Sequence, residues 1–346
     1  MSRFSKLVLC SLALVALVVF AGCAPAATPA PAEQGQPTAV EGPAATEAGG
    51  QPQVVQANLV FGMAVHANPA EDSFWGVVEK GAQDAAAALG VELRSGGNSD
   101  PAAQAQLVED YTGANVDGII VSLANPDALT DAVTKAVDAG IPVITINSGV
   151  DVYKNLGALT HVGQTEFVAG QGAGEKFNAA GASKVLCVIH EEGNIGLEQR
   201  CDGLADAFSG EVERFNVATT GVRDVAGTVS SIQNKLISST DIDAILTLNP
   251  VIAIAARDAI AAAGGSQQLA TFDLSPDVLA AIEAGEILFA VDQQQYLQGY
   301  LPVVFLYLYN TNLNTVGGGL PVLTGPGFVD QSNAAAVEDL AAQGTR

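Results

Sequence analysis

The chain has 346 residues and is strongly acidic, with 37 Asp and Glu against 14 Lys and Arg and a formal net charge of −23. A chain with this excess of negative charge repels phosphate backbones, so we expect no nucleic-acid partner. Its acidity suits a soluble protein that works outside the cytoplasm.

The first residues have the pattern of a secretory signal. Arg3 and Lys6 supply positive charge, and the apolar run 7–20 that follows is too short to span a membrane comfortably. We therefore expect residues 1–22 to be a signal peptide. The run ends in "FAGC", which resembles a bacterial lipobox, although its phenylalanine stands where leucine is usual. This resemblance implies that Cys23 carries lipid and anchors the protein to a membrane; the alternative is an ordinary signal peptide cleaved nearby.

Residues 23–56 are rich in Ala, Pro, Gln, Thr and Gly and contain few large apolar side chains. Such a segment buries too little surface to offset the entropy lost on ordering, so we expect a flexible, lipid-anchored linker. About 290 residues remain, more than a typical single domain contains, which predicts two lobes. No stretch after Cys23 is long and apolar enough to predict a membrane span.

From Asn58 onward, short apolar runs alternate with segments of helical spacing, and the pattern occurs in two series. The expected strands of the first series are 58–65, 90–96, 116–124 and 141–148, and its expected helices are 74–90, 101–113 and 126–140. The expected strands of the second series are 184–190, 213–218, 241–249, 269–274 and 287–294. Many of these strands are apolar throughout, which is typical of parallel strands buried on both faces. The fold class predicted is α/β, with two doubly wound, mostly parallel sheets.

Polar side chains follow the strands of both series. In open parallel sheets, ligands bind beyond the carboxyl ends of the strands, so these residues are the candidate site. They are His66, Asp72, Phe74, Trp75, Asn147 and Ser148 in the first series, and His190, Arg200, Asn249, Asp273 and Gln293 in the second. Short polar groups beside aromatic rings suit a small polyhydroxylated ligand, because each hydroxyl both donates and accepts.

Each of these residues also has a purely structural interpretation. Asn147 and Asn249 are residue types that cap helices and form turns, and Asp273 precedes a turn-like Leu-Ser-Pro sequence. Arg200 could lie on the surface of its helix, and the histidines could be hydrogen-bonded parts of the core. Phe74 and its neighbour Trp75, the only tryptophan, could both be core residues.

Two cysteines remain once Cys10 leaves with the signal and Cys23 is lipidated. Cys187 lies in an expected strand and Cys201 early in the next expected helix, where the two can pack together. A disulfide between them would close a loop of about 15 residues, worth ~3 kcal/mol in the chain-entropy model. The alternative is a pair of buried free thiols.

Residues 57–330 resemble the type I periplasmic binding proteins of sugar ABC transporters, in particular the group that includes ribose-binding proteins. The motifs that carry the resemblance are "FWGVVEKGAQDAAAALGV", "VDGIIVSLANPDALTDAVTKAVDAGIPVITINSG", "ILTLN", "TFDLSPDVLAAIEAGEI" and "VDQQQYLQGYLPV". The resemblance implies two lobes joined by a three-strand hinge and closing on one ligand. It implies an N-terminal lobe of residues 57–162 plus about 294–322, and a C-terminal lobe of residues 163–293 plus about 323–346.

The resemblance also implies roles for individual residues. Phe74 and Trp75 match the aromatic pair that sandwiches a sugar ring, and Arg200 matches an arginine that binds ligand hydroxyls. The polar contacts of the family fall on Asn249, Asp273 and Gln293. Asn147 and Ser148 stand where ribose binders carry Asp-Arg, which argues against ribose itself. The segment "HANPAED" lengthens the first loop and can bring His66 or Asp72 over the ligand.

The function predicted is a lipid-anchored, monomeric solute-binding protein that captures a small neutral sugar or polyol and delivers it to an ABC permease. The alternatives are a sensory module that presents ligand to a chemoreceptor or sensor kinase, and a nucleoside-binding lipoprotein. We expect no enzymatic activity, metal or cofactor. The "HEEGN" sequence at 190–194 lacks further metal ligands, and no nucleophile-elbow, Walker or dinucleotide motif occurs.

Overall fold

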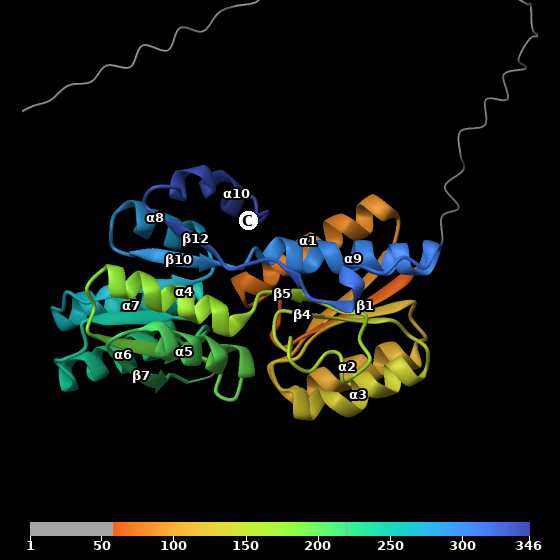
Figure 1. Ribbon diagram of the computed structural model, residues 1–346, viewed down its shortest axis with the longest axis horizontal. Helices are drawn as coiled ribbons and strands as arrows, with labels where there is room; N and C mark the ends of the chain where they lie inside the picture. The colour runs from red at the N-terminus through yellow and green to blue at the C-terminus, as the bar shows by residue number, and fades with distance from the viewer. Residues whose placement is uncertain (1–57, 219) are drawn as a thin grey trace, which may run out of the picture. The chain divides into compact units, whose positions relative to one another are not determined.

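The computed structural model describes residues 58–218 and 220–346, which form two α/β lobes (Figure 1). Each lobe is an open sheet of six strands with helices packed on both faces. The predicted fold class, with two doubly wound and mostly parallel lobes, is confirmed. The expected signal peptide (1–22), linker (23–56) and lipidated Cys23 lie outside the described residues.

The N-lobe is built on the sheet with strand order β11-β5-β4-β3-β1-β2, in which every neighbouring pair is parallel. Its strands are β1 Val60–Val65, β2 Glu92–Gly97, β3 Gly118–Ser122, β4 Val143–Ile146, β5 Thr160–Gly163 and β11 Val322–Leu323. Its helices are α1 Ser73–Leu89, α2 Pro101–Gly113, α3 Pro126–Asp138 and α9 Gln295–Asn312, with the short 3₁₀ turn Gly317–Gly319.

The C-lobe sheet repeats this order as β12-β10-β9-β8-β6-β7, with β12 antiparallel to β10 and the other pairs parallel. Its strands are β6 Lys184–Ile189, β7 Glu211–Asn216, β8 Ala244–Thr247, β9 Gln268–Phe272, β10 Phe289–Asp292 and β12 Gly327–Asp330. Its helices are α4 Glu166–Ala179, α5 Ile195–Ala207, α6 Val225–Ser238, α7 Pro250–Ala263, α8 Pro276–Glu283 and α10 Glu338–Ala342, with the 3₁₀ turn Ala334–Ala336.

Local sequence explains where the helices begin and end. Asp72, Asp100 and Asn125 cap α1, α2 and α3 through side-chain oxygens that accept backbone N–H groups of the first turn. Proline occupies the first turn of α2, α3, α7 and α8, where its missing N–H costs nothing. Gly90 ends α1 at φ 69°, a left-handed conformation that glycine adopts without steric penalty.

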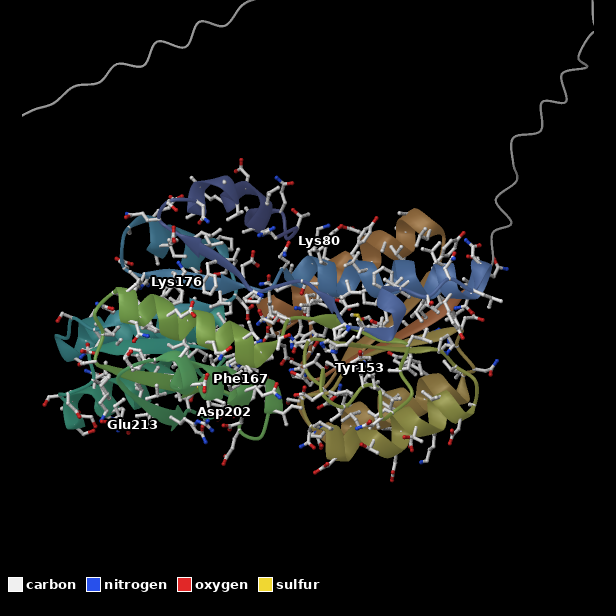
Figure 2. All side chains as sticks on the ribbon, in the orientation of Figure 1. Lys80, Tyr153, Phe167, Lys176, Asp202 and Glu213 are labelled. Atoms are coloured by element: carbon white, nitrogen blue, oxygen red, sulfur yellow. A yellow bond between two sulfur atoms is a disulfide. The ribbon has the colours of Figure 1, made fainter. Side chains whose placement is uncertain are left out.

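Each sheet separates two apolar cores. In β1, Phe61 and Met63 face α1 and α9, whereas Ala64 faces the opposite core beneath α2 and α3. In the C-lobe, α4 and α5 cover one face and α6, α7 and α8 the other. Figure 2 shows the side chains that fill these layers, with Phe167 marking α4 and Asp202 marking α5. Because the strands are covered on both faces, the loops at their carboxyl ends are the parts left free to form a site.

The chain crosses between the lobes three times. The crossings run from β5 to α4, from β10 to α9 and from β11 to β12. They are joined to one another, since Thr324 N–H donates to the Gly163 carbonyl at 2.7 Å and Gln294 Nε2 donates to the Thr324 carbonyl at 2.6 Å. The three-strand hinge predicted from the sequence is therefore present.

Candidate functional site

A small cavity lies where the strand ends of the two lobes meet. All eleven candidate residues named from the sequence line it, six from the N-lobe and five from the C-lobe side or the β10–α9 crossing. The lining also contains four residues outside that candidate set: Glu191, Asn194, Leu197 and Leu248.

The two lobes present matching positions to this cavity. His66 follows β1 and His190 follows β6, the strands that occupy the same place in the two sheet orders. In the same way, Asn147 follows β4 with φ 59° and Asp273 follows β9 with φ 70°. Asn and Asp are the non-glycine residues that tolerate this left-handed conformation best. The left-handed turn at each strand end therefore favours Asn or Asp. The polar side chains of these two residues also line the cavity.

On the N-lobe side, Asp72 begins α1 and places the two aromatic residues. Its Oδ1 accepts the backbone N–H groups of Phe74 at 2.9 Å and Trp75 at 3.4 Å. The two rings pack edge to face, with centroids 5.0 Å apart, and the Trp75 ring meets the His66 ring in the same way at 4.7 Å. Aromatic pairs prefer this geometry because the positive edge of one ring meets the negative face of the other.

Phe74 and Trp75 were expected to belong either to the cleft or to the core, and this either-or expectation was wrong. Both residues line the cavity, yet both belong to the apolar core beneath α1 and α9, with exposed fractions of 6% and 3%. A large ring can do both, since one part contacts the core while another borders the cavity. The rings are consequently fixed by packing before any ligand arrives.

On the C-lobe side, Arg200 of α5 is held by a carboxylate that the sequence reasoning missed. Its Nε lies 2.6 Å from Glu166 Oε2 and its Nη2 lies 3.1 Å from Glu166 Oε1. Its guanidinium also lies 4.4 Å from the Phe272 ring centroid and donates to the Leu248 carbonyl at 3.3 Å. Burial alone would lower the pKa of Arg200, but the Glu166 carboxylate outweighs it and keeps the pKa above its ordinary value. The arginine is thus permanently charged and fixed in orientation.

A signal for Glu166 existed in the sequence. It lies three residues after β5, in the first turn of α4. The rule that site residues follow strand ends therefore also points to this position. Glu191 directly follows His190 at the end of its strand, and Asn194 lies in the same "HEEGN" sequence. Among the described residues, no cluster of side chains able to hold a metal ion occurs.

A hydrogen-bonded row of side chains crosses from one lobe to the other beneath the cavity. Asn147 Nδ2 donates to Gln293 Oε1 at 3.1 Å, and Gln293 Nε2 donates to Asp273 Oδ1 at 2.7 Å. Gln298 of α9 completes the row by donating to Gln293 Oε1 at 2.9 Å. Burial raises the pKa of Asp273 to about 7, although the positive charge of Arg200 opposes this shift. Asp273 is therefore poised to gain stabilisation from any new hydrogen-bond donor.

Two further side chains combine a structural task with a place in the cavity. Asn249 caps α7, since its Oδ1 accepts the Val251 N–H at 2.8 Å, and its Nδ2 lies 3.5 Å from Asp72 Oδ2 of the other lobe. Ser148 Oγ lies 3.4 Å from Asn194 Oδ1, again across the two lobes. The capping role of asparagine and its place in the cavity are compatible, because each uses a different atom of the amide.

The histidines of the cavity are uncharged near neutral pH. Burial, reinforced by Arg200, lowers the pKa of His66 to about 3, and burial lowers that of His190 to about 4. The 3.6 Å approach of His66 Nε2 to Glu191 Oε2 is therefore a polar contact and not an ion pair. His66 also bonds to Ser122 Oγ through Nδ1 at 2.7 Å.

A disulfide joins Cys187 in the centre of β6 to Cys201 in α5. Cys201 directly follows Arg200, and both residues are buried. The covalent link ties the helix that carries Arg200 to the strand that ends at His190. The disulfide therefore limits movement of Arg200 relative to His190.

Sequence comparison identifies the family to which this geometry belongs. The profile of the periplasmic binding protein domain matches residues 62–311, most of the chain. The chain belongs to the periplasmic binding protein family. Membership implies an extracytoplasmic location. Within the described parts of this periplasmic binding protein, no helix has the length and apolar character needed to cross a membrane.

Several relatives of this periplasmic binding protein are named as sugar-binding proteins. It is 27% identical to the xylose/arabinose-binding protein of Sulfolobus acidocaldarius, over 80% of this chain and 71% of the relative. It is 30% identical to the ribose import binding protein of Haemophilus influenzae, over 68% of this chain and 80% of the relative. A carbohydrate transporter protein from Acidothermus cellulolyticus, solved in complex with myo-inositol, is 42% identical with a TM-score of 0.81, covering 84% of this chain and all of the other. These relatives are binding proteins, not enzymes.

Proposed function

We propose that this protein captures a small neutral polyol or monosaccharide, with cyclic polyols of the inositol type foremost, and delivers it to an ABC permease. The observation that carries the proposal is the cavity itself, which is lined from both lobes by polar side chains and has two fixed aromatic rings on one side. The relative solved with myo-inositol supports the choice of a cyclic polyol.

The chemistry of the lining favours a ligand with many hydroxyl groups. Asn147, Asn249 and Gln293 carry amides that both donate and accept, whereas Asp273 accepts and Arg200 donates. A hydroxyl can pair with any of these groups, so a ring that bears a hydroxyl on each carbon can satisfy several at once. The apolar C–H groups of such a ring suit the surfaces of the two aromatic side chains.

Closure of the two lobes follows from the same contacts. Across the lobes, Gln199 Nε2 donates to Asp151 Oδ2 at 2.6 Å, and the Ile195 N–H donates to the Ala124 carbonyl at 3.1 Å. They add to the contacts across the lobes described above, such as Ser148 with Asn194 and Asn249 with Asp72. A ligand that bonds to both lobes stabilises only the closed state, and so shifts the population toward it.

A panel of neutral ligands tests the proposal. Thermal-shift and calorimetric titrations with inositols, hexoses, pentoses and open-chain polyols should identify at least one cyclic polyol or monosaccharide that binds with micromolar or better affinity. Trp75 is the sole tryptophan, so its fluorescence should change when that ligand binds. Nucleosides belong in the panel, because binding of a nucleoside instead of any sugar or polyol would overturn the proposal.

A substitution at Asp273 locates the binding site. Asp273→Asn keeps the shape of the side chain but removes its charge, and is expected to weaken ligand binding by about tenfold to a hundredfold. Asp277→Asn is the matched control, since Asp277 is exposed in the first turn of α8 and lies outside the cavity. Equal affinities for the two variants would contradict the assignment of the cavity.

We also propose that Cys23 carries the lipid that holds the protein on the membrane surface. The "FAGC" sequence supports this. In a bacterial host, the wild-type chain should partition into the detergent phase of a Triton X-114 extraction, and Cys23→Ser should move it to the aqueous phase. A wild-type chain found only in the aqueous phase would contradict lipidation.

A further inference from the structure

The cavity contains more negative charge than its one cation can balance. Asp72, Asp273 and Glu191 all line it, and Arg200 is the only lysine or arginine that does. The charge of Arg200 is already matched by Glu166 through two short contacts. A neutral ligand supplies hydroxyl donors to these carboxylates but leaves the excess charge uncompensated.

Two of the three carboxylates, Asp72 of the N-lobe and Glu191 of the C-lobe, line both the cavity and the space next to it, and each has an oxygen atom to offer. Burial, and after it the charge of Glu191, raises the pKa of Asp72 to about 6. Asp72 uses Oδ1 to cap α1, and Oδ2 has only the 3.5 Å contact with Asn249. Glu191 accepts from Asn194 at 2.7 Å through Oε2, and no described residue donates to its Oε1.

A second, independent observation points to a missing donor or acceptor in the same cavity. His190 lines it with an exposed fraction of only 5%, and its Nδ1 has no hydrogen-bond partner among the described residues. A buried polar atom without a partner costs free energy unless a ligand or water bonds to it. The lining is therefore incomplete without an occupant that bonds to His190.

Asp72 and Glu191 also separate the cavity from a second space. They line both the cavity and a neighbouring chamber of about 190 Å³. Glu71 and Arg223 line the chamber as well and form an ion pair across the lobes at 2.9 Å. Because Arg223 is engaged by Glu71, it is not available to neutralise Asp72 or Glu191. The chamber leaves room for a substituent that extends past the two carboxylates.

We propose that this cleft prefers an amine-bearing polyol to the unsubstituted neutral one, and that the ammonium group binds between Asp72 and Glu191. The inference rests on the proposed function, since it concerns the same cavity. An ammonium group donates up to three hydrogen bonds and supplies the positive charge that the lining lacks. By the same electrostatics, the cleft discriminates against anionic sugars such as phosphate esters.

Three ligands of one shape test the preference by calorimetry at neutral pH: an inositol, an inosamine with one hydroxyl replaced by an ammonium group, and an inositol monophosphate. The inosamine is expected to bind about tenfold more tightly than the inositol, as charge-assisted hydrogen bonds are stronger than neutral ones. The phosphate ester is expected to bind at least about tenfold more weakly than the inositol. An inosamine that binds no more tightly than the inositol would overturn the inference and leave the proposed function intact. Failure of all three ligands and of every other neutral sugar would instead overturn the proposed function.

Substitutions assign the preference to the two carboxylates. Glu191→Gln should reduce the affinity ratio of inosamine to inositol from about ten to about one, whatever its effect on either ligand alone. Asp72→Asn should act in the same direction and preserves folding, because asparagine caps helices as well as aspartate does. Glu192→Gln is the matched control, since Glu192 is exposed and lies outside the cavity lining but its loss changes the net charge equally. A ratio that falls as much in Glu192→Gln as in Glu191→Gln would show that overall charge, and not this pair, sets the preference.

Discussion

The two lobes have the same strand order but contribute different chemistry to the cleft. At matching strand ends they carry the same or similar residue types, His66 with His190 and Asn147 with Asp273. The N-lobe adds two aromatic rings that belong to its own apolar core. The C-lobe adds a buried Arg200–Glu166 ion pair and the disulfide beside it.

This difference shows how one topology can supply two kinds of rigidity. In the N-lobe, the cleft residues are fixed by packing, which is nondirectional and tolerant of apolar replacement. In the C-lobe, they are fixed by charge pairing and a covalent link, which fail abruptly when one partner is removed. Substitutions in the two lobes should therefore have different profiles of stability loss and binding loss.

The largest effect is expected from breaking the ion pair of the C-lobe. Arg200→Met leaves the buried Glu166 carboxylate without its cation, with only the Gln164 amide donating to it, and should lower the free energy of unfolding by about 3–5 kcal/mol. Lys135→Met is the control, because the Lys135–Glu109 pair is exposed and should contribute less than about 1 kcal/mol. Chemical denaturation measures both. The double variant Arg200→Met/Glu166→Leu should recover much of the loss; if it does not, packing and not charge supports this part of the C-lobe.

Removing the disulfide tests how much this covalent link contributes to the stability of the C-lobe. The linked residues are 14 positions apart, so Cys187→Ala/Cys201→Ala should lower the free energy of unfolding by about 3 kcal/mol. A reducing agent should destabilise the wild type to a similar extent and leave the double variant unchanged. If the reductant has the same effect on both proteins, the link does not stabilise the C-lobe.

A conservative change in the N-lobe should separate packing from ligand contact. Phe74→Leu retains apolar volume and should cost less than about 1.5 kcal/mol of stability. It removes an aromatic surface from the cavity, so ligand affinity should fall by about threefold to tenfold. Phe177→Leu is the control, since Phe177 is fully buried in the C-lobe core and does not line the cavity. Equal affinities in the two variants would mean that Phe74 serves the core alone.

The smallest effect concerns pH. The pKa of Asp273 in the folded protein is raised to about 7 from an ordinary value of 3.8, so the folded state holds a proton that the unfolded state releases. Between these two pH values, the unliganded protein should lose stability as the pH rises. Asp273→Asn should remove the part of this pH dependence that Asp273 contributes, so the Tm of the variant relative to that of the wild type should increase as the pH rises from 4 to 8. Parallel Tm profiles for the two proteins would contradict the raised pKa.

The sequence by itself determined most of the fold. Alternation of apolar runs with helical spacing predicted the two sheets, because strands covered on both faces must be apolar throughout. Asp72 and Asn249 could be located at the ends of elements from local capping chemistry alone. The rule that ligands bind beyond strand ends, together with the family resemblance, selected eleven candidate residues, all of which line one cavity.

Only the tertiary structure decided how those side chains are used. The pairing of Arg200 with Glu166 joins residues 34 positions apart on two helices, and no local pattern specifies such a partner. The dual role of Phe74 and Trp75 depends on which surfaces of each ring face α9 and which face the cavity, a matter of packing that residue type does not fix. The excess charge at Asp72 and Glu191 likewise exists only because the lobes meet, since electrostatic interaction depends on distance through space and not on separation along the chain.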